Sequence, residues 1–384
     1  MRARAAVALV AVVVAMLVGC GGGGGQGAAG TGAAPPAAPA PDAGTDSDGG
    51  IVIGTDAGTD AGTPGQPPVW SVTDLGKGVA NFVDSQGRVA GFTCDDSSCS
   101  GAVYTAPAGW IPVPVPPGAV HVEVMGIDAA GRLALNVDYP ATMRSSYPLP
   151  YRWPPLELVP ILATDAKDLS RESRIAAMSS AGHLVGRLFE NANGPSVASG
   201  GYFYDGKVTR IAFGPGQNRG AAMALNSRDQ VVGWIQQGNE QHAFLWDHGV
   251  LRDLGTVSGA STMATGINDS GVVTGWGGTT PFSGVSVIFR WDGEMHPLGC
   301  PAGTIHCEAT AINARGDIVG QALTAEKTEV AFLYRDGVFH RLDDLVQGAE
   351  GWHFILASSI NDAGQIAGTG QLNGVDHGYL VTLR

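Results

Sequence analysis

The sequence predicts an all-β protein, in which a seven-bladed β-propeller of four-stranded antiparallel blades follows a disordered linker. Three observations predict this fold class. A short Asn/Gly pattern recurs roughly every 45 residues from residue 79 to the C-terminus. A second pattern, centred on Asp-Gly, follows it within the units. The chain also ends part-way through a unit, and the strand missing from that unit has a counterpart near residue 70.

The first pattern predicts a tight β-hairpin in each unit. An apolar residue precedes Asn, Asp or Ser, and after a turn that usually contains Gly, apolar and small residues lead to a final Gly. The Asx side chain opens such a turn by bonding its own downstream backbone, and Gly takes the position of positive φ. The seven copies are Val83–Gly91, Ile127–Leu135, Met178–Gly186, Leu225–Gly233, Ile267–Gly275, Ile312–Gly320 and Ile360–Gly368.

The second pattern predicts another hairpin about twenty residues further along each unit. It is clearest where Ala243–Trp246 and Val250–Gly255 flank Asp247-His248-Gly249. Asp-Gly between alternating apolar residues is a strong hairpin signal. The relatives of this segment are centred on Asp205-Gly206, Asp292-Gly293 and Asp336-Gly337. Each unit therefore holds four strands.

The two ends of the repeat region favour a closed ring over an open solenoid, since four strands per unit suit both. After the seventh copy, His377–Val381 matches a third strand, and the sequence then stops without a fourth. Trp70–Gly76 resembles the fourth strand at Leu251–Gly255. We therefore expect the N-terminal strand to complete the last blade, which closes the ring without a free sheet edge.

The N-terminus has the features of an export signal over residues 1–19. Arg2 and Arg4 precede an apolar run that is too short to span a bilayer as a mature helix. The run ends in Leu17-Val18-Gly19-Cys20, which resembles the lipobox of bacterial lipoproteins. The resemblance implies that Cys20 is lipidated and anchors the protein to the bacterial cell envelope, at the outer membrane or the cell surface.

Residues 20–68 form a linker rich in Gly, Ala, Pro and Asp, which cannot bury enough apolar surface to order. It should hold the globular part, residues 69–384, away from the membrane. The net charge of −13, with no basic stripe, argues against nucleic acid as a partner. We expect a monomer without a cofactor.

Four further cysteines fall into two local pairs, Cys94 with Cys99 and Cys300 with Cys307, each in a connection between strands. Two short disulfides in an oxidising compartment are the favoured interpretation. The alternative is a metal site that also uses His306, or Asp95 and Asp96, but neither pair has Cys-x-x-Cys spacing. We therefore expect disulfides and no metal.

The paired hairpins resemble the HAF repeat family of bacterial extracellular proteins. The resemblance rests on His242-Ala243-Phe244, on Asp253-Leu254-Gly255 and on Ile267-Asn268 with Gly271, and it is strongest from about residue 220 onwards. It implies an extracellular location and this type of repeat, and it supplies no catalytic residue. His242 and His377 fall in different blades, so we expect them to be structural.

The long connections of a propeller should share one face, where function is usually carried. The residues directly after each second strand, with others from two long connections, should open onto that face. The candidate ligand-binding residues are Tyr139, Arg144, Arg187, Trp234, Trp276, Gln321 and Trp352. Aromatic, Arg and amide groups suit a saccharide or a protein. The alternative for Trp234 and Trp276 is that they pack between blades.

No catalytic motif accompanies the repeat, so no catalytic residue is assigned. The sequence favours a non-catalytic binding or scaffolding protein of the cell envelope. An alternative is a propeller hydrolase or lyase that acts on polysaccharide, because carboxylates could meet across the ring. A mainly structural envelope protein is a third possibility.

Overall fold

The structure is a computed structural model that describes residues 69–94, 99–139, 148–161, 171–190, 197–213, 219–278 and 285–383. The chain divides into two units, Met1–Pro67 and Pro68–Arg384, and all described residues lie in the second. The predicted signal peptide and the whole predicted linker with Cys20 lie outside the described residues, as does Arg144. Among the described residues, no helix has the length and apolar character needed to cross a bilayer.

The described chain is built of antiparallel strands, which confirms the all-β prediction. Consecutive strands pair in groups of four. The first groups are β1 (Trp70–Val83), β2 (Val89–Cys94), β3 (Cys99–Thr105) and β4 (Gly109–Pro112); β5 (His121–Ile127), β6 (Leu133–Asp138), β7 (Leu149–Trp153) and β8 (Glu157–Leu158); and β9 (Arg171–Met178), β10 (Leu184–Glu190), β11 (Val197–Tyr204) and β12 (Val208–Ile211).

The remaining strands continue the same order. They are β13 (Gly220–Leu225), β14 (Val231–Gln237), β15 (Glu240–Asp247) and β16 (Val250–Gly255); β17 (Thr262–Ile267), β18 (Val273–Gly278), β19 (Ser286–Trp291) and β20 (Met295–Gly299); β21 (Thr304–Ile312), β22 (Ile318–Thr324), β23 (Glu329–Arg335) and β24 (Val338–Arg341); and β25 (Trp352–Ile360), β26 (Ile366–Leu372) and β27 (Val375–Leu383). A short helix, α2 (Leu342–Leu345), follows β24.

The predicted Asn/Gly hairpins are confirmed. At the clearest copy, the Asn268 Oδ1 accepts the backbone N–H groups of Ser270 and Val272, each at 3.0 Å. The central turn residue has a positive φ in every copy: Gly87, Gly131, Gly182, Asp229, Gly271, Gly316 and Gly364. Asp229 shows that an Asx residue can take the left-handed conformation that Gly adopts more easily.

The final Gly of the pattern has a different cause, which is the close approach of the first strand of the same unit. A Cβ on Gly275 would lie 2.0 Å from the Met263 carbonyl oxygen, because β17 bulges between Ala264 and Gly266. The same clearance recurs at Gly91, Gly233, Gly320 and Gly368. This Gly is therefore fixed by strand packing and not by the turn.

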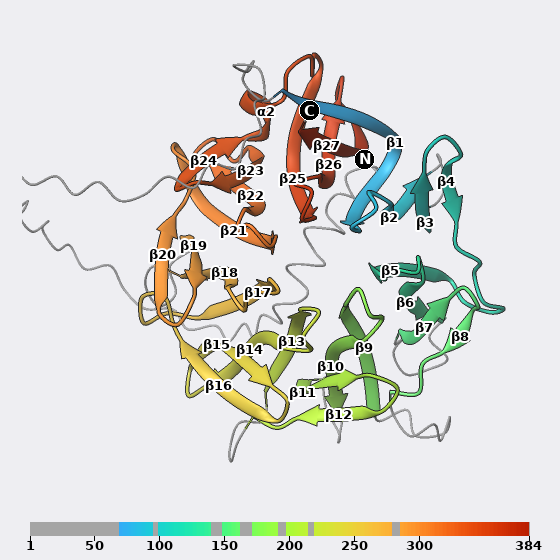
Figure 1. Cartoon of the computed structure of the whole chain (residues 1–384), viewed down its shortest axis with the longest axis vertical. Coiled ribbons are helices and arrows are strands. Elements are labelled where there is room, and N and C mark those ends of the chain that lie inside the picture. Colours follow the sequence, from blue (N-terminus) through green and yellow to red (C-terminus); the bar gives the residue numbers. More distant parts are fainter. Residues whose placement is uncertain are drawn as a thin grey trace, which may run out of the picture. The chain divides into compact units, whose positions relative to one another are not determined.

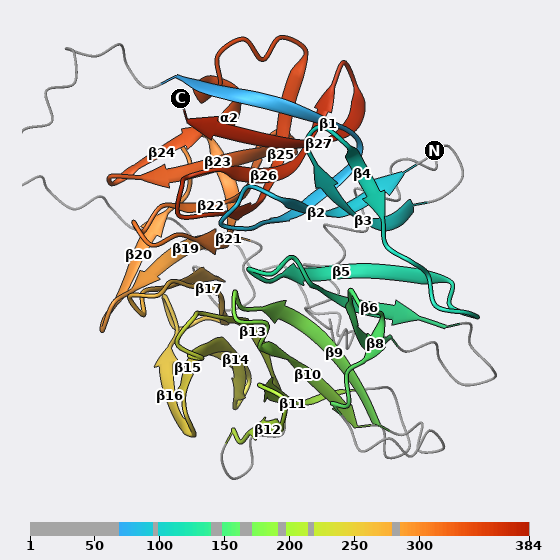
Figure 2. The same cartoon turned by 45° about the vertical axis from the view of Figure 1, so that its right-hand side comes forward.

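One long strand links the first group to the last. Trp70–Lys77 of β1 pairs with β27, and Gly78–Val83 pairs with β2, with a bend where Gly76 has φ +86°. The predicted pairing of Trp70–Gly76 with the C-terminal strand is confirmed by the register Trp70↔Leu383 and Val72↔Val381. Figure 2 shows β1 running beside β27 before it reaches β2.

Sheet pairing joins some of the groups. Because β1 is shared, β25-β26-β27-β1-β2-β3-β4 form a seven-stranded sheet. A single parallel bridge, Ser199↔Gly220, joins the groups β9–β12 and β13–β16 into an eight-stranded sheet. The groups β5–β8, β17–β20 and β21–β24 are separate four-stranded sheets.

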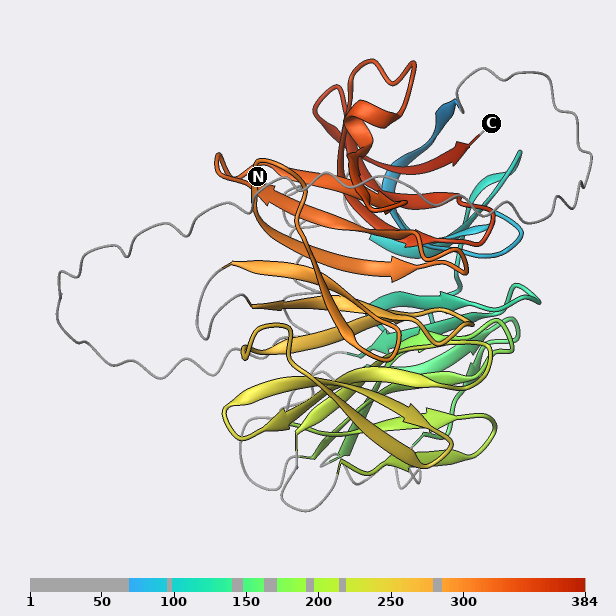
Figure 3. The same cartoon turned by 60° about the vertical axis from the view of Figure 1, so that its left-hand side comes forward.

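The core lies between neighbouring groups. In Figure 1 the sheets of residues 68–384 follow one another around a common centre, with β5, β9, β13, β17 and β21 towards it. Apolar faces of adjacent groups pack together, as Val232 and Ala243 do against Ala264 and Phe289. Figure 3 shows the same sheets from another side, with their strands running between two opposite ends.

These two ends differ in their connections. At the turn side, defined as the end where first strands join second and third strands join fourth, the connections are the predicted hairpins. At the opposite end, the loop side, the expectation of uniformly long connections is wrong. The β14–β15 connection is only Gly238-Asn239, and the β26–β27 connection is only Asn373-Gly374. Here the ladders simply continue into a tight turn.

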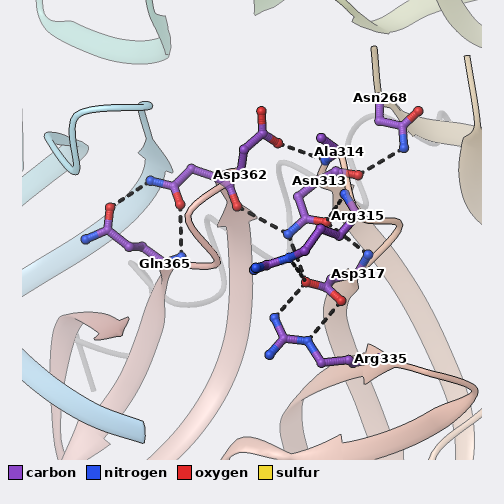
Figure 4. Close-up of polar contacts among 9 residues, drawn as sticks. Asn268, Asn313, Ala314, Arg315, Asp317, Arg335, Asp362 and Gln365 are labelled. Atoms are coloured by element: carbon purple, nitrogen blue, oxygen red, sulfur yellow. Dashed lines mark hydrogen bonds and ion pairs between the residues drawn. The ribbon is translucent and has the colours of Figure 1, made fainter. Parts of the chain in front are cut away.

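The turn side is tied together by the Asx residues of the repeat (Figure 4). The Asn268 side-chain amide donates to the Asn313 carbonyl at 3.0 Å, and the Asn313 amide donates to the Asn361 carbonyl at 3.3 Å. The Asn361 amide donates to the Asp84 carbonyl at 2.8 Å, which links the last group to the first. Each Asn therefore caps its own turn with its oxygen and fastens the next turn with its nitrogen.

At the first copy, where the repeat has Asp84, an arginine replaces the missing amide. The Arg88 Nε donates to the Asp84 carboxylate at 2.5 Å, and its Nη2 reaches the Ala129 carbonyl of the next group at 3.0 Å. Asp84 with Arg88 thus supplies the acceptor and the donor that Asn supplies alone. At the next copy, Arg132 bonds its own Asp128, and the backbone N–H of Ala129 donates to the Ser180 carbonyl of the following group at 3.0 Å.

Candidate functional site

The sequence-predicted ligand-binding residues lie near the loop side, but several are inside strands. Arg187, Trp234, Trp276 and Gln321 belong to β10, β14, β18 and β22, so the expectation that they directly follow a strand is wrong. The antiparallel ladder continues past the repeat Gly at these positions.

Trp234 and Trp276 illustrate the consequence. Trp234 is only 5% exposed, and the indole of Trp276 packs edge-on against His306 of the next group, with ring centroids 6.2 Å apart. Both indole N–H groups are buried without a hydrogen-bond partner among the described residues. Their placement matches the alternative of packing between groups more closely than an open binding surface.

Arg187 is also buried, in a charged cluster between β5–β8 and β9–β12. Burial lowers the pKa of Arg187 to about 10, with Arg174 acting in the same direction and Glu123 opposing it. Arg174 makes an ion pair with Glu123. Beside them, the Asn136 side chain bonds both the N–H and the carbonyl of Ile175 at 3.0 Å. These side-chain contacts link the strands β5–β8 to the strands β9–β12.

Tyr139, Gln321 and Trp352 are each engaged within the protein. Burial raises the pKa of Tyr139 to about 12, and the Tyr151 hydroxyl 3.0 Å away adds to the effect. The Gln321 Nε2 donates to Glu308 at 3.1 Å. Trp352 stacks on Phe354 with centroids 5.5 Å apart. The structure therefore distributes the candidate residues among separate local contacts and does not bring them to one place.

A hydrogen-bonded Ser-His-Glu set lies next to Trp276. The His306 Nδ1 is 2.8 Å from the Ser286 Oγ, and its Nε2 is 2.9 Å from Glu308. A nucleophilic serine needs access to its substrate, whereas Ser286 is 3% exposed and its Oγ also lies 2.7 Å from the Cys307 carbonyl oxygen. The set therefore anchors the backbone around Cys307.

The predicted disulfides are present. Cys94 at the end of β2 bonds Cys99 at the start of β3, and Cys300, just after β20, bonds Cys307 within β21, so three of the four cysteines lie in strands and not in the expected connections. The alternative metal sites would need these sulfurs as free thiolates. Within the described ranges, no group of His, Cys, Asp and Glu side chains is arranged to hold a metal ion.

Most histidines of the described chain face a carboxylate. His242 lies 2.9 Å from Asp253, and His377 lies 2.7 Å from Asp74, at the equivalent place. Both aspartates also accept the N–H of a Gly two residues on, at 2.8 Å. The His-Ala-Phe and Asp-Leu-Gly motifs thus meet across the third and fourth strands. The other pairs are His183–Asp229, His248–Asp247, His296–Asp292, His306–Glu308 and His353–Asp343.

His340 departs from this rule and lines a hollow at the loop side. The hollow has a volume of about 240 Å³ and is lined by Pro301, Ala302, Phe339, His340, Arg341, Asp344 and Leu345. Among the described residues, neither the His340 imidazole nor the Asp344 carboxylate has a hydrogen bond or an ion pair. The sequence analysis missed this site, although the hairpin at Asp336-Gly337 places Phe339–Arg341 at the end of a fourth strand.

No protein-family model matches the chain, and no curated protein sequence matches it. The chain is similar to several solved structures. The β-propeller domain of the Trilobed protease from Pyrococcus furiosus is 12% identical, with a TM-score of 0.45 over 68% of this chain and 83% of that one. Virginiamycin B lyase from Staphylococcus aureus is 14% identical, with a TM-score of 0.45 over 83% of this chain and 100% of that one.

A third similar structure is the six-bladed β-propeller lectin of Aleuria aurantia. It is 10% identical, with a TM-score of 0.40 over 73% of this chain and 96% of that one. These similarities do not identify a ligand or an activity for this chain.

Proposed function

We propose that this protein is a seven-bladed β-propeller of the bacterial cell envelope, anchored through a lipidated Cys20, that binds an extracellular saccharide or protein at its loop side. The sequence resemblance to the HAF repeat family and to bacterial lipoproteins supports this location and anchor. Two disulfides are typical of a protein in an oxidising compartment outside the cytosol.

Seven blades are supported by the contacts of the first strands. In chain order, β1, β5, β9, β13, β17, β21 and β25 each contact the next, and β25 contacts β1. Each of these strands begins a group of four strands. The last group takes its fourth strand from the first half of β1. A ring of this kind leaves no group without neighbours on both sides.

The observation that supports the binding function is a contrast in hydrogen bonding between the turn side and the loop side. At the turn side, the Asn226, Asn268, Asn313 and Asn361 amides are all donated to the next turn. At the loop side, His340 and Asp344 line a hollow without partners. A ligand can bond polar groups at the loop side without displacing a bond that holds the fold.

Photo-crosslinking on intact cells tests which side binds. Benzoylphenylalanine replaces Glu350, exposed in the connection after α2 at the loop side, or Glu294, exposed in a hairpin at the turn side. Because the hollow with His340 and Asp344, which have no partner among the described residues, lies at the loop side, we expect irradiated adducts from position 350 and none from position 294. Adducts from position 294 alone, or equal yields from both positions, would contradict the proposal.

The lipid anchor is tested separately with Cys20→Ser. The thiol of Cys20 is the proposed site of acylation, so the variant should lose incorporation of radiolabelled palmitate. It should also move from the membrane pellet to the soluble fraction, since a flexible linker alone has no affinity for a bilayer. Unchanged labelling and sedimentation of the variant would refute the anchor and leave the binding side unaffected.

A further inference from the structure

The hollow beside His340 is formed by three separate segments. Pro301 and Ala302 come from the connection between β20 and β21, Phe339–Arg341 from the end of β24, and Asp344 and Leu345 from α2. All three meet at the loop side. A volume of about 240 Å³ is smaller than the clefts that bury drug-sized ligands, so the hollow suits one small ring.

The walls of the hollow are held in place before any ligand arrives. The disulfide Cys300–Cys307 ties the ends of one wall, and the Arg341 Nη2 bonds the Ala302 carbonyl oxygen at 2.9 Å. Phe339 packs against Phe332 and Tyr334, with ring centroids 5.5 and 4.8 Å away. A preformed site loses less conformational entropy on binding than a mobile one.

The lining combines apolar and polar groups in a small space. Phe339, Pro301 and Leu345 offer apolar surface. His340 and Asp344 have unused hydrogen-bonding atoms, and the hydrogen bond of the Arg341 side chain to Ala302 uses one of the five N–H donors of a guanidinium. Donors and acceptors around an apolar patch match a ring that carries hydroxyl groups on its edge and C–H groups on its face.

We propose that this hollow binds a single neutral sugar ring of an extracellular polysaccharide. The inference rests on the proposed function and specifies its ligand. A neutral sugar fits better than a uronic acid because the Asp344 carboxylate offsets the Arg341 charge and repels an anionic substituent. A protein partner would need a far larger surface than these residues provide. So few ligand atoms predict a dissociation constant in the range of about a millimolar.

The test is a titration of the full-length detergent-solubilised protein with methyl glycosides of neutral hexoses, followed by saturation-transfer NMR. We expect saturable binding of at least one neutral glycoside, and binding of methyl glucuronide at least about tenfold weaker. His340→Ala and Asp344→Ala should each weaken binding about tenfold. Ala302→Trp should abolish it, because a large exposed side chain fills the hollow without entering the core.

Matched controls lie at the turn side. His248→Ala and Glu294→Ala remove an exposed imidazole and an exposed carboxylate there, and should bind as the unmodified protein does. Thermal unfolding of every variant shows whether it is folded. If neutral glycosides bind but all three hollow variants bind equally well, the sugar lies elsewhere and the inference about the hollow is overturned.

Other outcomes separate the inference from the proposed function. No saturable binding of any neutral glycoside up to about 50 mM would overturn the sugar-ring inference. Crosslinked adducts from position 350 would in that case still support a loop-side binder of protein. Release of nitrophenol from a nitrophenyl glycoside, lost in the hollow variants, would make the site catalytic and overturn non-catalytic binding.

Discussion

A chain that begins at Gly78 is expected to lose its stable fold, whereas a chain that begins at Val69 is expected to keep it. The shorter chain lacks the segment that pairs with β27. It also lacks Trp70, which is 4% exposed and lies under the Arg335 guanidinium at 5.0 Å, and Leu75, which is 3% exposed. Loss of one large buried aromatic side chain costs about 3–5 kcal/mol.

That loss is comparable with the whole stability of an ordinary domain, about 5–15 kcal/mol. Urea unfolding followed by tryptophan fluorescence should show a cooperative transition for the chain from Val69 and a shifted or absent one for the chain from Gly78. The exposed edge of β27 should also cause association, seen by size-exclusion chromatography. A synthetic peptide of residues 68–77 should restore the transition. Equal urea midpoints for both chains would refute the closing role of this strand.

Gly275→Ala is expected to lower the free energy of unfolding by about 3 kcal/mol, the upper end of the usual cost of overpacking. The added Cβ would lie 2.0 Å from the Met263 carbonyl oxygen and 2.8 Å from the Ala264 Cα, both backbone atoms that cannot rotate away. Paired strands β17 and β18 would have to separate. Urea denaturation provides the measurement.

Gly200→Ala is the matched control for this substitution. Gly200 also lies in a paired strand, has no atom within 4 Å of the added Cβ and is outside the left-handed region. Its replacement should change stability by less than about 1 kcal/mol, and a reduced entropy of the unfolded chain favours a gain. Equal destabilisation by both substitutions would show that backbone flexibility, and not contact with β17, explains the glycine.

The repeat made the hairpins predictable because each depends on residues close together in the sequence. Asn268 and Gly271 indicate the turn in which they lie, and Asp253 with Gly255 indicates the end of a strand. The inter-group bond from Asn268 to Asn313 could not be predicted, because it depends on how closely neighbouring turns approach. The positive φ of Gly76 recurs at Gly255 and Gly299, but among the described strands only β1 continues past this glycine to join two groups into one sheet, which local sequence does not indicate.

The site was less predictable than the fold. The repeat predicts that Trp234 and Trp276 lie near one end of the second strand, but their exposure depends on the neighbouring sheet, and Trp234 is buried and Trp276 half-buried. The hollow at His340 joins a disulfide-bonded connection, a strand end and a short helix. Irregular segments such as these have no periodicity, so their meeting cannot be read from sequence.

The shared strand β1 also sets the order in which the protein can be completed. The Ser71 and Thr382 hydroxyls, 3.3 Å apart, are separated by 311 residues along the chain. Trp70–Lys77 therefore leaves the ribosome first among the described strands and finds its partner last. Until Leu383 has emerged, the first sheet and the last each have an open edge, and contacts of such long range form slowly. A chaperone that shields Trp70 until synthesis is complete would protect the chain at its most exposed stage.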